Sequence, residues 1–256
     1  MICMARAILN QYLVLLRRYY VDTCFSFLST YLFFYFLFLT IRGVTVGTPL
    51  FDKAIENIVI GFFIFFLGSN VFSGLAWGLA SEAQQGTLEQ LSMSPFGLTK
   101  ILLTKVFISI LFQFFFSVAF LYLMMTTSGI ILDIRWLELM PILFFTLAGV
   151  LGLGLFMGGL VLVFKKIRSI FQFFHFVFIG VVMVPLSTSV MLKFFPLSWG
   201  AYLMRKIILE NKSILHLEVP DMIFLVANSI CYLCVGILVF RLCERIARDR
   251  GLLSHY

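Results

Sequence analysis

The stretch SEAQQGTLEQLSMSP, residues 81–95, is a mainly polar run in a chain that is otherwise strongly apolar. Hydrophobic residues make up 62% of the 256 residues and charged residues only 12%, whereas soluble domains carry roughly 45–50% and about 25%. This composition is typical of an integral membrane protein. Residues 81–95 therefore form a polar connection between two apolar runs, each near the roughly 20 residues that cross a bilayer as a helix.

Working outward from this connection, hydropathy predicts an all-α integral membrane protein with six spans in a single domain, 1–256. The predicted spans cover residues 23–41, 58–80, 101–128, 139–164, 170–192 and 222–240. An even number of spans places both termini on one side. Of the 19 Lys and Arg residues, twelve fall on that side and seven on the other, which favours cytoplasmic termini because basic residues are retained inside. The basic residues are scattered over the connections and form no patch for nucleic acid.

Residues 1–21 are predicted to form an amphipathic helix lying in the membrane surface. Its apolar face comprises Ile8, Tyr12, Leu15 and Tyr19, and its polar face Arg6, Asn10 and Arg17. The alternative is an ordinary frayed terminus.

The segment 193–221 is neither a clean span nor a simple polar loop. Pro196, Gly200 and Pro220 punctuate it, and Trp199 and Tyr202 are residue types that favour the headgroup level. We expect residues 197–209 to form a short extracytoplasmic re-entrant helix. Because irregular backbone at membrane depth must be covered by protein or line a wet cavity, this segment should cap something.

Several kinds of chemistry have no candidate residues in the sequence. The six predicted spans contain no Asp or Glu, which argues against a proton- or sodium-driven transporter. There is no motif for a hydrolase or a phosphate-binding loop, and no cluster of His, Cys and Asp for a metal site. Cys231 and Cys234 form a C-x-x-C inside an apolar span, which we interpret as small packing residues. Any uphill transport must therefore draw its energy from another polypeptide.

The polar stretch itself predicts a short helix between two breaks. Gly86 ends the preceding helix, Thr87 can cap a new one with Gln90 completing a capping box, and Pro95 ends it. The product would show two leucines on one face and be too short to be stable alone, so it should bind in a partner's groove. A plain helical hairpin turn is the alternative interpretation.

The run EAQQGTLEQLSMSPFGLTKILLTK resembles the segment after the second span in permease subunits of type 2 ABC exporters, where E-x-x-x-G-T-L-E-x-L-x-x-[ST]-P leads into the third span. GLGLFMGGLVLVFKKIRSIFQ and FPLSWGAYLMRKI are similar to later parts of the same family. The resemblance covers the whole chain and is specific in the G-T-L-E-x-L core.

The resemblance implies a coupling helix within 81–97 that seats in a cleft of a separate ATP-binding-cassette ATPase. The matching residues are Glu82, Gly86, Thr87, Leu88, Glu89, Leu91 and Pro95. It also implies two ATPase copies and a second permease copy, identical or related. The chain itself would be non-catalytic and bind no cofactor or metal, ATP and magnesium being bound by the ATPase. We expect a multi-pass protein of a prokaryotic plasma membrane. One departure from the family is the basic character that Lys193, Arg205, Lys206 and Lys212 give the segment after span five.

In the family, spans two and five meet at the interface between permease copies, and this analogy gives candidates for a substrate path. They are Phe62, Phe66, Asn70, Phe171, Phe174, His175 and Phe178. An aromatic path with few polar groups suits a lipid-like, drug-like or amphipathic peptide substrate. The alternative is that these Phe residues face lipid or neighbouring helices and that His175 packs inside the protein. A non-transporting membrane scaffold or sensor that binds an ATPase remains the alternative function.

Overall fold

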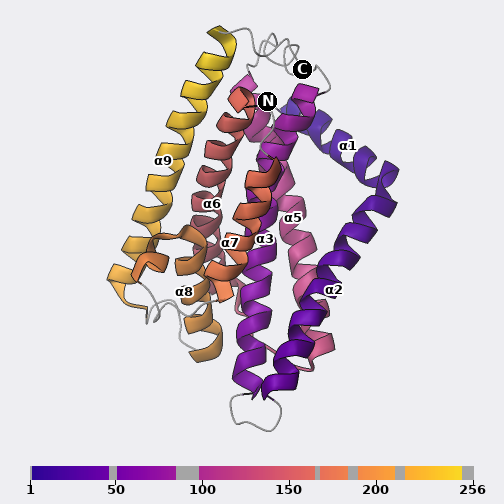
Figure 1. The fold of residues 1–256 in the computed structure, drawn as a ribbon, viewed down its shortest axis with the longest axis vertical. Coiled ribbons are helices and arrows are strands. Elements are labelled where there is room, and N and C mark those ends of the chain that lie inside the picture. Colours follow the sequence, from indigo (N-terminus) through magenta and orange to yellow (C-terminus); the bar gives the residue numbers. More distant parts are fainter. Residues whose placement is uncertain are drawn as a thin grey trace.

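The computed structural model describes residues 2–45, 51–84, 98–164, 168–183, 190–210 and 217–249, which form only helices and their connections. Eight α-helices and one 3₁₀ helix lie in these described ranges (Figure 1). Their bounds are α1 Ile2–Arg18, α2 Tyr20–Thr45, α3 Phe51–Gln84, α5 Leu98–Ser128, α6 Trp136–Phe164, α7 Arg168–Met183, η2 Val190–Phe194, α8 Pro196–Glu210 and α9 Val219–Asp249.

Five of the helices, α2, α3, α5, α6 and α9, are long and apolar enough to cross a membrane. They correspond to predicted spans one to four and six, and each extends at one or both ends beyond the predicted span. The prediction of one continuous helix over 170–192 is wrong at its end, because α7 ends at Met183 and Val190–Phe194 forms a 3₁₀ helix. Pro185, two residues after Met183 in the sequence, explains part of this difference, since a proline disfavours helical geometry in the residue before it.

Helices α2, α3, α5 and α6 alternate in direction, so the bundle has two distinct ends. Figure 1 shows the beginning of α1, the end of α3, the beginning of α5 and the end of α9 at one end, which we call the terminal end. The end of α2, the beginning of α3 and the α5–α6 connection lie toward the other end, as does α8. The predicted coupling segment thus joins two helix ends at the terminal end.

Helix α3 runs through the middle of the protein. It packs against α2, α5, α6, α7 and α8, and most of its side chains between Ile55 and Phe72 are buried. The aromatic side chains around it interdigitate; Phe66, for example, stacks on Phe120 of α5 with ring centroids 4.8 Å apart. Burial of this apolar surface against other helices makes α3 the central element of the bundle.

Helices α6 and α9 lie side by side and run parallel, and glycine residues bring their backbones into contact. A Cβ on Gly152 would overlap the main chain of Tyr232, and a Cβ on Gly236 would overlap the carbonyl oxygen of Gly152. Farther along, a Cβ on Gly159 would lie 3.1 Å from the Cα of Phe240. In lipid, where helices gain little from hydrophobic burial, close backbone contact of this kind holds helices together.

Helix α1 forms over nearly the whole segment predicted for it and bends at Tyr19 into α2. Ile8 is buried, and Tyr12 stacks on Phe112 of α5 with centroids 4.7 Å apart. Leu15 and Tyr19, the other members of the predicted apolar face, are exposed. Helix α1 therefore packs on the bundle as far as Tyr12 and leaves it after that residue, as the chain turns toward α2.

Candidate functional site

The beginning of α8 is buried deep in the bundle. A Cβ on Gly68 of α3 would overlap the side chain of Leu197, and one on Gly149 of α6 would lie 2.7 Å from the Cβ of Pro196. Gly149 is 13 positions after Trp136, the first residue of α6, which corresponds to about 20 Å along the helix. The chain thus returns into the bundle after α7, and α8 leads it out again from a starting point between α3 and α6.

Close steric contact fixes α8 against α6. A Cβ on Gly200 would overlap the Thr146 side chain, so this position accepts no larger residue without movement of one helix. Residues 196–201 are all buried. This burial satisfies the condition under which a helix terminus is tolerated at membrane depth.

Polar contacts tie α8 and the preceding 3₁₀ helix to the first turns of α9. The indole Nε1 of Trp199 donates a hydrogen bond to the Asp221 carbonyl oxygen at 3.0 Å. Lys206 Nζ lies 3.3 Å from Asp221 Oδ2, and Asn228 Nδ2 donates to the Phe194 carbonyl oxygen at 2.9 Å. Burial on its own would lower the pKa of Lys206, but the hydrogen bond to Asp221 and the charges of Tyr202, Asp221 and Glu218 outweigh it and raise that pKa above its ordinary value.

Arg205 reaches from α8 to the end of α7 and to α3. Its Nη2 donates to the Val182 carbonyl oxygen at 2.7 Å and approaches the Asn57 carbonyl oxygen at 3.5 Å. Val182 lies in the last turn of α7, where carbonyl groups have no partner within the helix and a cation is favourable. Burial lowers the pKa of Arg205, although an arginine remains charged in proteins.

The span-two path candidates pack inside the protein. Phe62 is fully buried, with its ring centroid 5.3 Å from that of Phe34 in α2 and 6.0 Å from that of Phe120 in α5. Phe66 also contacts Phe120, and Asn70 Nδ2 donates to the Phe66 carbonyl oxygen of its own helix at 2.8 Å. These side chains face neighbouring helices of the same chain.

The span-five candidates form a second aromatic cluster around Phe72 of α3. The centroids of Phe171, Phe174 and Phe178 lie 5.7, 5.4 and 5.0 Å from that of Phe72. Phe171 and Phe178 are buried, whereas His175 is only partly buried. The structure therefore places the predicted path residues in two clusters, one beside α2 and α5 and one beside α7.

The exposed face of α7 carries different aromatic residues. Phe173 and Phe176, with exposed fractions of 64% and 74%, lie on it together with Gly180. Their spacing of three and four residues was readable in the sequence. Phe171, Phe174 and Phe178 follow an equally regular helical spacing, so spacing alone does not single out Phe173 and Phe176.

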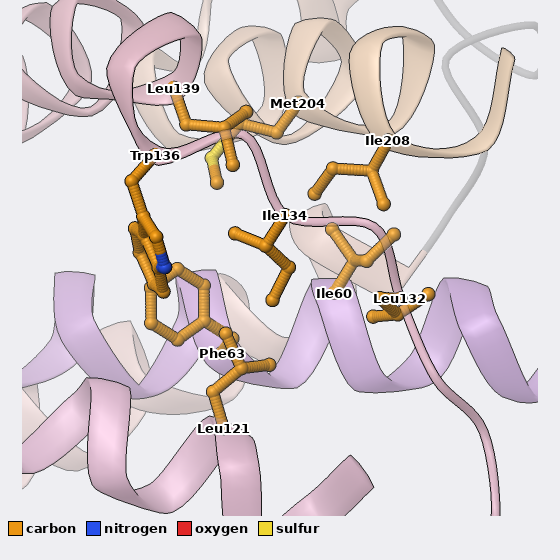
Figure 2. A pocket seen from close by; sticks show the side chains of 9 residues that line it. All are labelled: Ile60, Phe63, Leu121, Leu132, Ile134, Trp136, Leu139, Met204 and Ile208. Atoms are coloured by element: carbon orange, nitrogen blue, oxygen red, sulfur yellow. The ribbon is translucent and has the colours of Figure 1, made fainter. Parts of the chain in front are cut away.

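Two hollows in the described part of the chain are apolar. One is a small pocket where the connection between α5 and α6 passes between α3 and α8 (Figure 2). Its lining consists of Ile60, Phe63, Leu121, Leu132, Ile134, Trp136, Leu139, Met204 and Ile208. The other is an open groove of about 680 Å³ between α2 and α5, lined by Thr23, Cys24, Phe27, Leu28, Tyr31, Phe116, Ala119 and Leu123. Neither hollow offers a charged group to a ligand.

The predicted coupling residues are described only in part. Helix α3 continues four residues past the predicted span end at 80 and stops at Gln84, with Glu82 in its last turn. Gly86, Thr87, Leu88, Glu89, Leu91 and Pro95 lie outside the described residues.

No protein-family model and no curated protein matches this chain. Assignment of a function therefore rests on the residues and on the geometry described above.

Proposed function

We propose that this chain is the membrane-spanning permease subunit of an ATP-binding-cassette exporter. In this proposal it moves a lipid-like, drug-like or amphipathic peptide substrate out of the cytoplasm. Its energy comes from ATP that a separate ATPase subunit hydrolyses. The working unit contains two ATPase copies and a second permease copy, as the resemblance of residues 82–95 implies.

The observation that carries the proposal is the different construction of the two ends of the bundle. The terminal end joins α3 to α5 through the polar segment 85–97. Toward the other end, helix α8 fills the space between α3, α6, α7 and α9. These two features correspond to what the resemblance implies: a coupling element on the cytoplasmic side and short helices after span five that close the extracytoplasmic side.

The fold suggests how ATPase movement would reach the substrate path. Leu88 and Leu91 are predicted to bind in a groove of the ATPase, and the segment that holds them continues directly into α3 and α5. Nucleotide binding would move the ATPase subunits together and tilt these two helices. Because α3 also contacts α7 and α8, a tilt of α3 changes the packing at the opposite end, where the substrate leaves.

The exposed side of α7 supports the expected contact with a second copy. Phe173 and Phe176 project outward next to the buried cluster around Phe72. A path between two copies would then be lined by these exposed aromatic residues, with Phe171, Phe174 and Phe178 supporting them from behind. This arrangement keeps the predicted aromatic character of the path.

A test is ATP-dependent movement of a fluorescent amphipathic lipid in vesicles that contain the chain and its co-purified ATPase. Replacement of Leu88 and Leu91 by Asp should abolish both co-purification of the ATPase and transport. Gln85→Asp adds a charge on the other side of Gly86 and serves as the matched control, which should keep both activities. ATPase binding that depends on Leu88 and Leu91 without any transport would favour the scaffold alternative, and unaltered binding and transport in the double variant would contradict the coupling role.

A further inference from the structure

Two neighbouring cations on α8 have different surroundings. Lys206 pairs with Asp221 at 3.3 Å. Arg205 is bonded only to main-chain oxygens and forms an ion pair with no carboxylate in the described ranges of the chain. A partly buried charge without a counter-ion is unfavourable. Of the two cations, Arg205 is therefore the one whose positive charge is available to an external anion.

The Arg205 guanidinium is held in a defined position at the junction of α3, α7 and α8. Its Nη2 is held by the carbonyl oxygens of Val182 and Asn57. Gly61 provides the space, because a Cβ at this position would lie only 2.8 Å from Nη2. Contacts on one side of the group therefore fix its orientation before any ligand arrives, which lowers the entropic cost of binding.

The other side of the guanidinium has unused donors. Nε is enclosed and has no hydrogen-bond partner. Nη1 has no protein partner in the described part either, but it is not enclosed. A guanidinium binds phosphate and carboxylate oxygens more strongly than neutral acceptors because both partners are charged. The accessible Nη1 is thus the point at which an anion can reach Arg205.

We propose that Arg205 binds the anionic headgroup, a phosphate or a carboxylate, of an amphipathic molecule at the α8 end of the bundle. This proposal rests on the proposed function and names the chemical class of its substrate. The surroundings favour an amphipathic molecule over a free ion, because apolar side chains lie next to the guanidinium. The Val182 and Met183 side chains would be 3.4 and 3.6 Å from a Cβ placed on Gly61. A single fixed cation with apolar side chains beside it matches a charged headgroup attached to a hydrocarbon chain.

The proposal can be tested by native mass spectrometry of the purified full chain in a neutral detergent. The probes are phosphatidic acid, phosphatidylcholine and inorganic phosphate. The variants are Arg205→Gln, Arg205→Lys and, as matched control, Lys206→Gln. Glutamine ends at the position of the arginine Nε, so Arg205→Gln removes both the charge and the Nη2 contact with the Val182 carbonyl oxygen, and its melting temperature is measured beside its lipid binding.

We expect the first phosphatidic acid to bind about tenfold or more weakly to Arg205→Gln, from the loss of one charge-assisted interaction. Arg205→Lys should be intermediate, and Lys206→Gln should bind like the wild type. Gly61→Ala, which keeps the charge but displaces the guanidinium, should also weaken binding. A melting temperature close to that of the wild type for Arg205→Gln would separate this effect from misfolding.

Equal binding of phosphatidic acid by wild type and Arg205→Gln would overturn the proposal, and so would an equal loss in Lys206→Gln, which would indicate general surface charge. Inorganic phosphate that displaces phosphatidic acid at comparable concentration would overturn the amphipathic part, since a free anion would then suffice. The assay needs no ATPase. Arg205-dependent binding in a chain that recruits no ATPase would therefore contradict the proposed function alone, whereas ATP-driven transport without Arg205-dependent binding would contradict this inference alone.

Discussion

The backbone contact between α6 and α9 predicts that Gly152→Ala destabilises the protein. The new Cβ would lie 2.6 Å from the Leu233 nitrogen and still closer to the Tyr232 carbonyl group. Main-chain atoms cannot rotate away as a flexible side chain can, so the two helices must separate by roughly 1 Å, and an overpacked contact of this kind costs about 1–3 kcal/mol. For a chain of this size the melting temperature should fall by about 3–10 °C.

The assay is thermal unfolding of the purified chain in detergent. The height of the size-exclusion peak that remains after heating is measured at each temperature. Gly180→Ala is the matched control, because a Cβ there meets nothing within 4 Å and the change in helix propensity is the same. Gly236→Ala acts on the same contact from α9, since its Cβ would overlap the Gly152 carbonyl oxygen. The two substitutions separate the same pair of helices, so the double variant should lose less than the sum of the single losses. If Gly152→Ala had the same melting temperature as the wild type and as Gly180→Ala, the reasoning would be refuted.

Three further predictions concern the contacts of α8 and α1. Trp199→Phe removes the hydrogen bond to the Asp221 carbonyl oxygen but keeps a ring against Phe224, and should lower stability by about 1 kcal/mol in the same thermal assay; no change would mean that the bond contributes nothing. Because the pKa of Lys206 is raised, the stability supplied by its pair with Asp221 is present below the ordinary pKa of 10.5 and is lost as pH rises through the higher pKa of the folded state. The difference in melting temperature between wild type and Asp221→Asn should thus be constant from about pH 6 to 9 and shrink only above 10.5; a decrease near neutral pH would contradict it. Tyr12→Ala removes the stack on Phe112 and should speed tryptic cleavage after Arg17 and Arg18, whereas Tyr20→Ala, at an exposed position, should leave the rate unchanged.

The predicted elements came from patterns that depend on the local sequence alone. Runs of apolar residues gave the five long helices, since an apolar stretch of sufficient length forms a helix in lipid whatever surrounds it. Pro196 and the aromatic residues near it predicted the start of α8 to within one residue. Helix ends were predicted less well, because helices extend past the apolar run wherever the flanking residues are compatible with a helix, as in the segment from Ser81 to Gln84.

Contacts between elements were not predictable from local patterns. The depth of α8 depends on three glycines in three helices, Gly68, Gly149 and Gly200, and the local sequence around each glycine does not indicate which helix it contacts. The position of Arg205 depends in the same way on Gly61, which is 144 positions earlier in the chain. Regular spacing placed Phe171, Phe174 and Phe178 on one face of α7 correctly, but it could not tell whether that face meets α3 or a second copy.

Helix α8 is held differently by its different neighbours, and under the proposed function this difference indicates which helix moves. Two polar contacts with Asp221 and the close contact of Gly200 with Thr146 tie α8 to α9 and α6. Its contacts with α3 are of a different kind: Leu197 packs at Gly68, and the one polar contact, between Arg205 and the Asn57 carbonyl oxygen, is long at 3.5 Å. Helix α3, of 34 residues, is about 51 Å long and connects the predicted coupling segment to α8, so α3 should slide past a fixed group of α6, α8 and α9.

This argument gives a prediction about restraint of transport. A short bismaleimide cross-link between Gly68→Cys and Leu197→Cys joins α3 to α8 and should stop ATP-dependent transport, because the two helices could no longer move relative to each other. A cross-link between Phe194→Cys and Phe224→Cys joins the 3₁₀ helix before α8 to α9, at positions whose native rings lie 5.8 Å apart, and should leave transport intact. The natural cysteines are first replaced by serine, and reversal by a cleavable linker restores activity if the block is mechanical. Full transport with α3 held to α8 would place the movement elsewhere, because a helix that is fixed at both ends of the bundle cannot carry the coupling.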